Sequence, residues 1–153
     1  MTGARFTPLG GFGSIYLASD AVTALREVSA VFGEGTIRTP PWAVFAVEGF
    51  LQGILDLTDL KVQSRLETSL SELTGDWVLS QDLYREGSGP LPPTQRLATV
   101  AHNLGSIVGI RYRSTKNIQS GINVVVFSDR LTPDRPSYLS VYDPSGLLRQ
   151  RLP

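Results

Sequence analysis

The sequence predicts an α+β domain with a mixed sheet core and a few short helices. Strand-like runs outnumber helical ones, and their order along the chain is mixed. The 153 residues include 15 Gly and 10 Pro, which predicts many turns and short elements rather than a helical bundle. No internal repeat or low-complexity tract divides the chain. We therefore expect one domain over residues 1–153, long enough to bury a real core.

The first elements are expected to be a strand and a helix. A glycine-rich segment precedes a short apolar run at Ser14–Ala18, which reads as a β-strand. Asp20 is the expected N-cap of a helix that runs to about Phe32 and stops at Gly33.

This first helix has an apolar stripe that is expected to face the core. Its members recur at helical spacing: Ala21, Leu25, Val28 and Phe32, widened by Ala24 and Val31. Glu27 lies at the edge of the stripe, whereas Arg26 points away from it. Glu27 is therefore expected at the rim of the core.

The middle of the chain predicts two strands and then helices. Trp42–Val47 and Gly53–Leu57 read as strands. Thr58 is expected to cap a helix from Asp59 to about Glu67. The pattern over Thr68–Glu86 leaves open whether it holds one short helix or two.

A clearer helix follows two prolines. It is expected over Thr94–Leu104, with Gly105 as its C′ residue. Its apolar residues stand at ideal helical spacing: Leu97, Val100, Ala101 and Leu104. The remaining runs read as strands: Ile107–Tyr112, Asn123–Phe127, Tyr138–Tyr142 and Leu147–Leu152, with a turn at Asp143–Gly146 joining the last two into a hairpin.

Composition argues against several classes of partner. The chain has 14 Lys plus Arg and 14 Asp plus Glu residues, so its formal net charge is zero. Such a chain has little long-range positive electrostatic potential to attract nucleic acid or anionic lipid. The absence of Cys removes disulfides, thiolate nucleophiles and the usual structural zinc sites, which fits a cytoplasmic protein. The most apolar stretch, Trp42–Leu57, is too short and too interrupted to span a membrane. The first residues, Met1–Gly13, lack the apolar core of a signal peptide.

Common catalytic motifs are also missing. The sequence has no phosphate-binding GxxxxGK[ST], no GxGxxG and no G-x-S-x-G. The only histidine, His102, is expected at a helix flank, without evident partners for a triad or a metal. Asp56 and Asp59 are the one tempting carboxylate pair, but they read more simply as a strand end and a helix start. We therefore expect no metal and no bound cofactor.

Four polar residues remain in apolar surroundings: Arg5, Tyr16, Glu27 and Ser114. Each has an ordinary explanation when taken alone. Arg5 could be a solvated terminal charge, and Tyr16 a core ring with its hydroxyl at the edge. Glu27 could be a surface acid and Ser114 a turn residue. Together they would suit a pocket for an anionic, planar, sugar-bearing ligand. A guanidinium forks onto phosphate oxygens, a phenol stacks on a base, and a carboxylate bonds ribose hydroxyls.

Short segments over most of the chain carry a family resemblance. In order they are Arg5–Pro8, Gly10-Gly11, Ile15–Ala18, Thr23–Val28, Leu55–Asp59, Thr94-Gln95, Gly109–Ser114 and Gly121–Phe127. Their order and spacing resemble the RES domain family, which is named for its Arg, Glu and Ser. The family supplies the toxin halves of bacterial RES/Xre toxin–antitoxin pairs. Its members usually have a further strand upstream of the arginine, so this chain is expected to lack that strand.

The resemblance implies an ADP-ribosyltransferase-like fold and an enzyme that cleaves the nicotinamide–ribose bond of NAD+, with water or phosphate as acceptor. Glu27 would stabilise the developing positive charge, and Arg5 would hold the pyrophosphate. Tyr16 would stack on the nicotinamide, Ser114 would orient the nicotinamide amide or the ribose, and Asn123 would join the substrate-binding residues.

The resemblance also implies partners and leaves alternatives. NAD+ is expected as substrate, and a cognate Xre-type antitoxin as protein partner. An ADP-ribosyltransferase with a protein target is one alternative. A non-catalytic RES scaffold that binds a nucleotide or a partner protein is the other.

Overall fold

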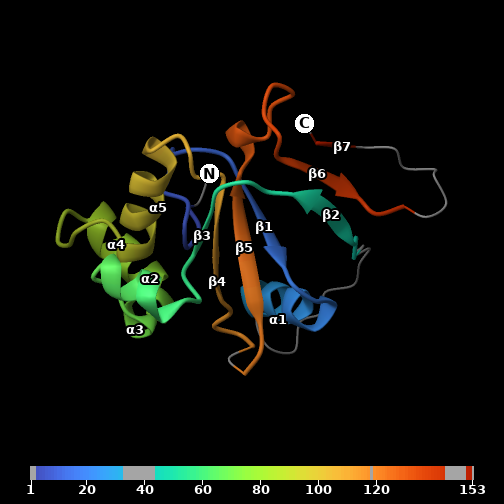
Figure 1. Ribbon diagram of the computed structural model, residues 1–153. Helices are drawn as coiled ribbons and strands as arrows, with labels where there is room; N and C mark the ends of the chain where they lie inside the picture. The colour runs from blue at the N-terminus through green and yellow to red at the C-terminus, as the bar shows by residue number, and fades with distance from the viewer. Residues whose placement is uncertain (1–2, 33–43, 118, 144–150, 153) are drawn as a thin grey trace.

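A computed structural model of the chain describes residues 3–32, 44–117, 119–143 and 151–152 (Figure 1). Its elements in chain order are β1 (Ser14–Ala18), α1 (Ala21–Phe32), β2 (Val47–Phe50), β3 (Ile54–Asp56), α2 (Leu60–Arg65), α3 (Leu70–Thr74), α4 (Trp77–Arg85), α5 (Pro93–Asn103), β4 (Gly109–Arg113), β5 (Ile122–Phe127), the 3₁₀ turn η1 (Ser128–Arg130), β6 (Tyr138–Val141) and β7 (Arg151–Leu152).

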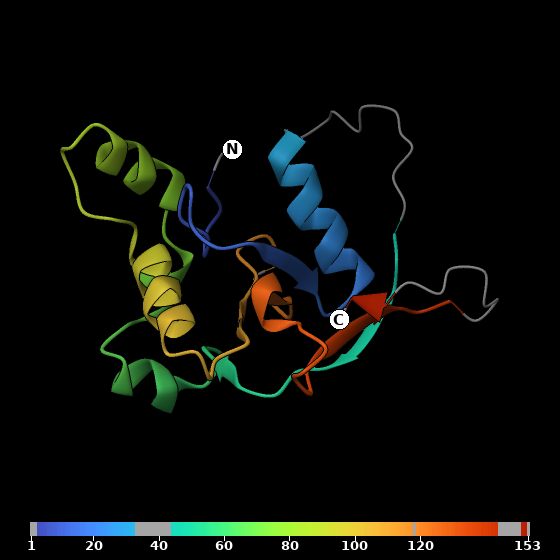
Figure 2. The same cartoon turned by 90° about the horizontal axis from the view of Figure 1, so that it is seen from above.

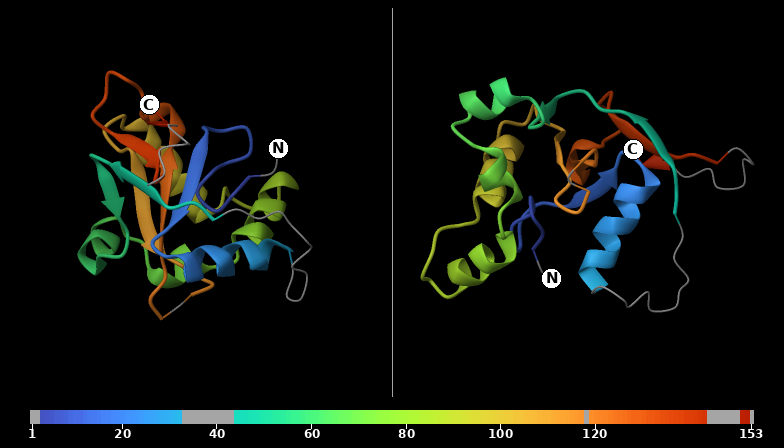
Figure 3. Two further views of the ribbon diagram at one scale, coloured as in Figure 1. Left: turned by 90° about the vertical axis from the view of Figure 1, so that its right-hand side faces the viewer. Right: turned by 90° about the horizontal axis from the view of Figure 1, so that it is seen from below.

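The strands form two sheets. The larger has the order β1-β5-β4-β3, in which β3 and β4 run parallel and the other pairs antiparallel. The smaller is antiparallel, with the order β2-β6-β7. Helices α2 to α5 gather beside β3 and β4, whereas α1 lies apart from them (Figures 2 and 3). The expected α+β class with a mixed sheet and short helices is confirmed.

The core lies on both faces of the central strand β5. Val125 and Phe127 point to one face, where they pack with Phe6 and the α5 side of the molecule. Val126 points to the other face and packs with Leu139 of the smaller sheet. Successive side chains of β5 therefore point to opposite faces of the sheet and connect the two hydrophobic clusters through one strand.

Helix α1 begins where the sequence predicts, but it buries a different face. The Asp20 carboxylate accepts a hydrogen bond from the Thr23 amide at 2.8 Å, as an N-cap does. Thr23 is fully buried, whereas Leu25 and Val28 of the expected core stripe are exposed. The prediction for that stripe is wrong because the polar contacts of Thr23 turn this side of the helix toward the protein. The expected stop at Gly33 and the side chains of residues 29–32 lie outside the described residues.

The middle segments differ from the prediction at their boundaries. Strand β2 covers Val47–Phe50 and shares only Val47 with the expected strand Trp42–Val47, because residues 44–46 are not strand and residues 42–43 lie outside the described part. Asp59, not Thr58, caps α2, because its carboxylate accepts from the Lys61 amide at 2.7 Å while Thr58 bonds back to Asp56. Thr68–Glu86, left open by the sequence, contains the two helices α3 and α4.

Helix α5 begins and ends one residue before the predicted bounds Thr94–Leu104, and Gly105 follows its C-cap with a positive φ of 73°, as expected. Its apolar stripe is only partly buried, because Val100 and Leu104 are exposed. Instead Thr94 and Gln95 are buried, and they donate hydrogen bonds to backbone carbonyls of the N-terminal turn. These polar contacts rotate the stripe away from the core.

The C-terminal strands appear close to their expected positions. β6 and β7 pair antiparallel, with Leu139 opposite Leu152, in agreement with the predicted hairpin. The turn expected at 143–146 lies largely outside the described residues, as do residues 147–150 of its second strand. Among the described helices none is both long and apolar enough to cross a lipid bilayer.

Candidate functional site

One face of the larger sheet collects polar side chains. Tyr112 on β4 lies directly opposite Asn123 on β5, and Tyr16 on β1 lies opposite Val125. Residues opposite each other in an antiparallel pair point to the same face, and so do residues two apart on one strand. Tyr16, Tyr112 and Asn123 therefore share a face of the sheet.

Glu27 reaches this face from α1. Its Oε1 atom accepts two hydrogen bonds, from Ser114 Oγ and from Asn123 Nδ2, both at 2.7 Å. Its second oxygen, Oε2, has no hydrogen-bond partner among the described residues. One oxygen of the carboxylate is thus held by two side chains, and the other makes no hydrogen bond with the described residues.

Ser114 is buried, with 2% of its surface exposed, just after β4. Its Oγ donates to Glu27 and accepts from the amides of Lys116 at 3.1 Å and Asn117 at 2.9 Å. A hydroxyl has one proton and two lone pairs, so these three bonds use its whole capacity. Ser114 is therefore placed to hold Glu27.

A second set of hydrogen bonds ties α1 to the loop after β4. Asn117 donates from Nδ2 to Thr23 Oγ1 at 2.9 Å, and Arg26 donates to Asn117 Oδ1 at 2.9 Å. Arg26, expected to point away, thus contacts this loop. The interior contacts of Thr23 and Asn117 secure the helix that carries Glu27. Sequence reasoning missed Asn117, because a lone Asn in a polar loop carries no distinguishing signal.

Arg5 lies in the N-terminal turn, where its guanidinium donates from one nitrogen to the carbonyls of Leu73 and Gly75, both at 3.0 Å. Burial lowers the pKa of Arg5 from its ordinary value, while the nearby Tyr112 and Glu27 act to raise it. Arg5 remains a cation at neutral pH and belongs to the same electrostatic neighbourhood as Glu27.

Tyr16 is anchored by its hydroxyl. The oxygen accepts from the Phe6 amide at 3.0 Å and shares a hydrogen bond with Thr7 Oγ1 at 2.8 Å. Burial raises the pKa of Tyr16, although these two hydrogen bonds oppose the shift. The residue still has 39% of its surface exposed, so part of it faces solvent.

Tyr112 was not identified from the sequence. It is buried and packs on Phe6 with ring centroids 4.5 Å apart. Burial raises the pKa of Tyr112, and nearby Tyr16 and Glu27 raise it further, so its phenol stays neutral. Its position two residues before Ser114, on a strand, is the signal that would have found it.

Asn123 carries an unusual feature. It is buried, its Nδ2 donates to Glu27, and its side chain also interacts with the hydroxyl of the neighbouring Tyr112, although no donor among the described residues lies within ordinary hydrogen-bond geometry of its Oδ1. A buried acceptor without a partner costs about 1–3 kcal/mol. A ligand or a water that donates to Oδ1 would remove this cost.

The other candidates from the sequence, His102 and the pair Asp56 and Asp59, make hydrogen bonds and ion pairs with residues outside the Glu27 site. His102 bonds to Asp129 at 2.9 Å and stacks on Phe12, with ring centroids 4.2 Å apart. Asp56 accepts from Thr58 and pairs with Arg111 at 2.8 Å, whereas Asp59 caps α2. Within the described ranges no cluster of three or more His, Cys, Asp or Glu side chains is arranged to hold a metal ion.

The structure thus brings the five sequence-derived residues together. Ser114 and Asn123 are both hydrogen-bonded to Glu27. Arg5 interacts electrostatically with Glu27 and Tyr16, and Tyr16 lies on the same face of the sheet as Asn123. A search of curated proteins finds no match. The family model for the RES domain matches residues 1–142, which is most of the chain. The chain therefore belongs to the RES domain family.

Proposed function

We propose that this protein consumes NAD+ by cleaving the bond between nicotinamide and ribose. The observation that carries the proposal is the Glu27 carboxylate, which has one oxygen held by Ser114 and Asn123 and the other without a described partner. RES domains are associated with NAD-related toxin function, which supports the same reading.

The chemistry requires little acid catalysis. When the C1′–N bond breaks, its electron pair stays on the ring nitrogen, and the cationic pyridinium leaves as neutral nicotinamide. Positive charge then develops on the ribose, and a nearby carboxylate stabilises it. Water forms the new bond to C1′ and loses a proton to bulk solvent, or a phosphate oxygen forms that bond directly. In this proposal Glu27 faces the ribose with Oε2.

Ser114 and Asn123 act on this step through Glu27. A carboxylate fixed before the reaction need not reorganise as charge develops, which is the main advantage of a preorganised site. In this proposal Asn123 Oδ1, which lies beside the Tyr112 hydroxyl, also accepts from a donor such as a ribose hydroxyl or an amide. Ser114 has no bonding capacity left, so we assign it the positioning of Glu27 rather than direct contact with NAD+.

Arg5 and Tyr16 serve substrate binding in the proposal. The two carbonyls that Arg5 contacts use one guanidinium nitrogen, and its other nitrogens have no hydrogen-bond partner among the described residues. These N–H groups suit phosphate oxygens. The Tyr16 ring, held through its hydroxyl, is suited to stack on the nicotinamide. A cognate Xre-type antitoxin is part of the same proposal.

The decisive experiment incubates purified protein with NAD+ and follows nicotinamide release by chromatography, in buffer with and without phosphate. Glu27→Gln, which keeps size and removes charge, is expected to lower turnover about 100-fold or more. Glu86→Gln, on an exposed acid at the end of α4, is the matched control and should behave as wild type. Wild type without nicotinamide release, or Glu27→Gln with full turnover, would refute the proposal.

A second assay separates the acceptors. Labelled NAD+ is added to a lysate together with the protein, and labelled protein bands are sought. Release of free ADP-ribose or its phosphate ester without labelled bands supports the proposal. Labelled bands that need Glu27 would assign a protein acceptor instead.

A further inference from the structure

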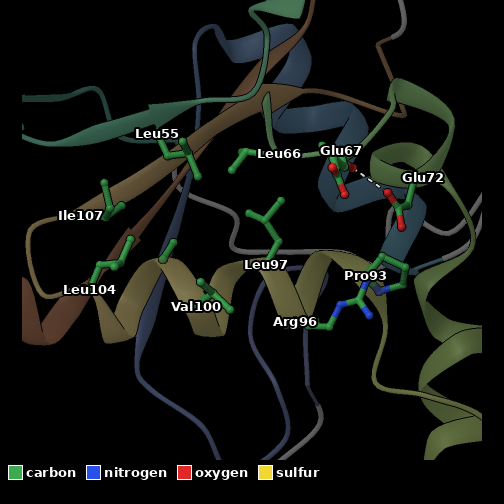
Figure 4. Close-up of a pocket in the computed structure, with 12 residues that line it drawn as sticks. Leu55, Leu66, Glu67, Glu72, Pro93, Arg96, Leu97, Val100, Leu104 and Ile107 are labelled. Atoms are coloured by element: carbon green, nitrogen blue, oxygen red, sulfur yellow. Dashed lines mark hydrogen bonds between the residues drawn. The ribbon is translucent and has the colours of Figure 1, made fainter. Parts of the chain in front are cut away.

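The apolar stripe of α5, in which Val100 and Leu104 are exposed, lines a groove of about 320 Å³. The groove runs between α5 and the segment that links α2 to α3 (Figure 4). Its apolar walls are formed by Leu55, Leu66, Leu97, Val100, Leu104 and Ile107. None of these residues belongs to the Glu27 site.

The polar end of the groove carries three charged side chains: Glu67, Glu72 and Arg96 (Figure 4). Glu72 accepts a hydrogen bond from Thr68 at 2.7 Å. The side chains of Glu67 and Arg96 have no hydrogen bond or ion pair with any residue that the structure describes. Two carboxylates against one guanidinium leave this end with an excess negative charge.

Glu67 holds a backbone conformation that favours glycine. Its φ is 53°, and it is the C′ residue of α2: its amide bonds to the Ser64 carbonyl, and the Thr68 amide bonds to the Gln63 carbonyl. This is the Schellman arrangement, in which Gly at C′ avoids strain. A strained residue that points its carboxylate into a groove suggests a role for that carboxylate.

We propose that this groove binds an amphipathic helix of a partner protein, with aliphatic anchors on one face and a Lys or Arg at the Glu67 end. The apolar residues of α5 in the groove determine the shape: Val100 and Leu104 are exposed, and Leu97 is partly buried against the core. Leu97, Val100 and Leu104 are spaced i, i+3 and i+7, which spans about 10 Å along the helix. A partner helix with anchors at the same spacing matches this length.

A helix fits better than a small apolar molecule. Val100 and Leu104 have 59% and 66% of their surface exposed, so the groove is open along one side. A small ligand there would keep much of its surface in water, whereas drug-sized sites bury most of their ligand. The excess negative charge at the Glu67 end complements a basic side chain.

The test uses a designed, fluorescein-labelled helical peptide with Leu at i, i+3 and i+7 and one Lys beyond the last Leu. Fluorescence anisotropy should show saturable binding to the full chain. The double variant Val100→Asp, Leu104→Asp is expected to weaken binding at least about tenfold. Leu60→Asp, which places the same charge at an exposed apolar position outside the groove, should bind as wild type.

The charge and the backbone strain of Glu67 have different readouts: peptide binding for the charge and the melting temperature for the strain. A peptide with Glu in place of Lys should bind more weakly to wild type. Glu67→Gly should raise the melting temperature, because it relieves the positive φ, and should weaken binding of the Lys peptide. Circular dichroism confirms that each variant is folded.

Three results would overturn the inference. The first is equal binding by wild type and the Val100→Asp, Leu104→Asp variant, and the second is no saturable binding by wild type. The third is self-association of wild type in sedimentation that the double variant abolishes, which would assign the groove to a second copy. None of these results depends on NAD+ turnover, so the proposed function stands or falls separately.

Discussion

Ser114 and Glu27 lie 87 positions apart in the sequence and are joined by a hydrogen bond of 2.7 Å. The bond runs from the serine hydroxyl to the same carboxylate oxygen that Asn123 contacts. Two donors on one oxygen orient the carboxylate, and its other oxygen makes no hydrogen bond with the described residues. This relationship is the basis of the first prediction.

Ser114→Ala removes one of the two donors that hold Glu27. We expect kcat for nicotinamide release to fall about ten- to hundredfold, with a smaller change in KM, because the serine does not face the substrate. Steady-state kinetics over a range of NAD+ concentrations measure both constants. Ser106→Ala, at an exposed serine before β4, is the control. A change confined to KM would assign Ser114 to substrate contact instead.

Gly121→Ala is expected to disturb the hydrogen bonds of Ser114, because Gly121 packs against Ser114 and Asn117. A Cβ at Gly121 would lie 2.6 Å from Asn117 Cβ and 2.8 Å from Ser114 Cβ, closer than such atoms approach. The loop after β4 must shift, at a cost of about 1–3 kcal/mol. Urea unfolding should show this loss, and nicotinamide release should fall with it. Unchanged stability would mean that the loop yields freely.

Arg5→Ala is expected to weaken NAD+ binding more than the chemical step. Loss of a charge-assisted, two-pronged contact costs about 1.5–3 kcal/mol, which corresponds to a KM increase of roughly 10- to 150-fold. Arg5→Lys should restore little, because an ammonium lacks the planar fork. Arg85→Ala, on an exposed arginine, is the control. A lower kcat at saturating NAD+ with unchanged KM would contradict the assigned role.

The Asp56–Arg111 pair should make a pH-dependent contribution to stability. Burial acts to raise the pKa of Asp56, but hydrogen bonds from Thr58 and Arg111 outweigh it and hold the pKa below the ordinary 3.8. A depressed pKa means that the contribution is present above the unfolded value and is lost as the pH falls through the folded one. Because both side chains are over a third exposed, we expect at most about 1 kcal/mol.

Urea unfolding of wild type and Asp56→Asn measures this contribution. Asp56→Asn should be less stable at pH 7, and the difference should shrink below about pH 3.8. Asp82→Asn, which breaks a looser exposed pair with Arg85 at 3.9 Å, should change stability less. A difference that is the same at both pH values would exclude the charge as its cause.

Local signals were predictable from the sequence. The cap at Asp20 and the positive φ at Gly105 appear as expected, and α5 begins at Pro93, one residue before the predicted start. Each depends on residues within about one helical turn, where capping and turn chemistry act. The cap at Thr58 was wrong by one residue, because Asp59 competes for the same role with a stronger acceptor.

The buried faces of the helices were not predictable. Leu25 and Val28 on α1 and Val100 and Leu104 on α5 have the spacing of a core stripe, yet all are exposed. Which side of a helix is buried depends on the groups beside it. Here polar contacts of Thr23 on α1, and of the N-terminal turn of α5, rotated each helix.

By itself the sequence determined the fold class, the family, and the residue types at Arg5, Tyr16, Glu27, Ser114 and Asn123. Only the tertiary structure decided that Glu27, Ser114 and Asn123 meet on one oxygen atom, and that Tyr112 joins their face of the sheet. The physical reason is the sequence separation over which each kind of interaction acts. Caps and turns act within a few residues, whereas a contact across 96 positions exists only when strand pairing and helix docking bring the segments together.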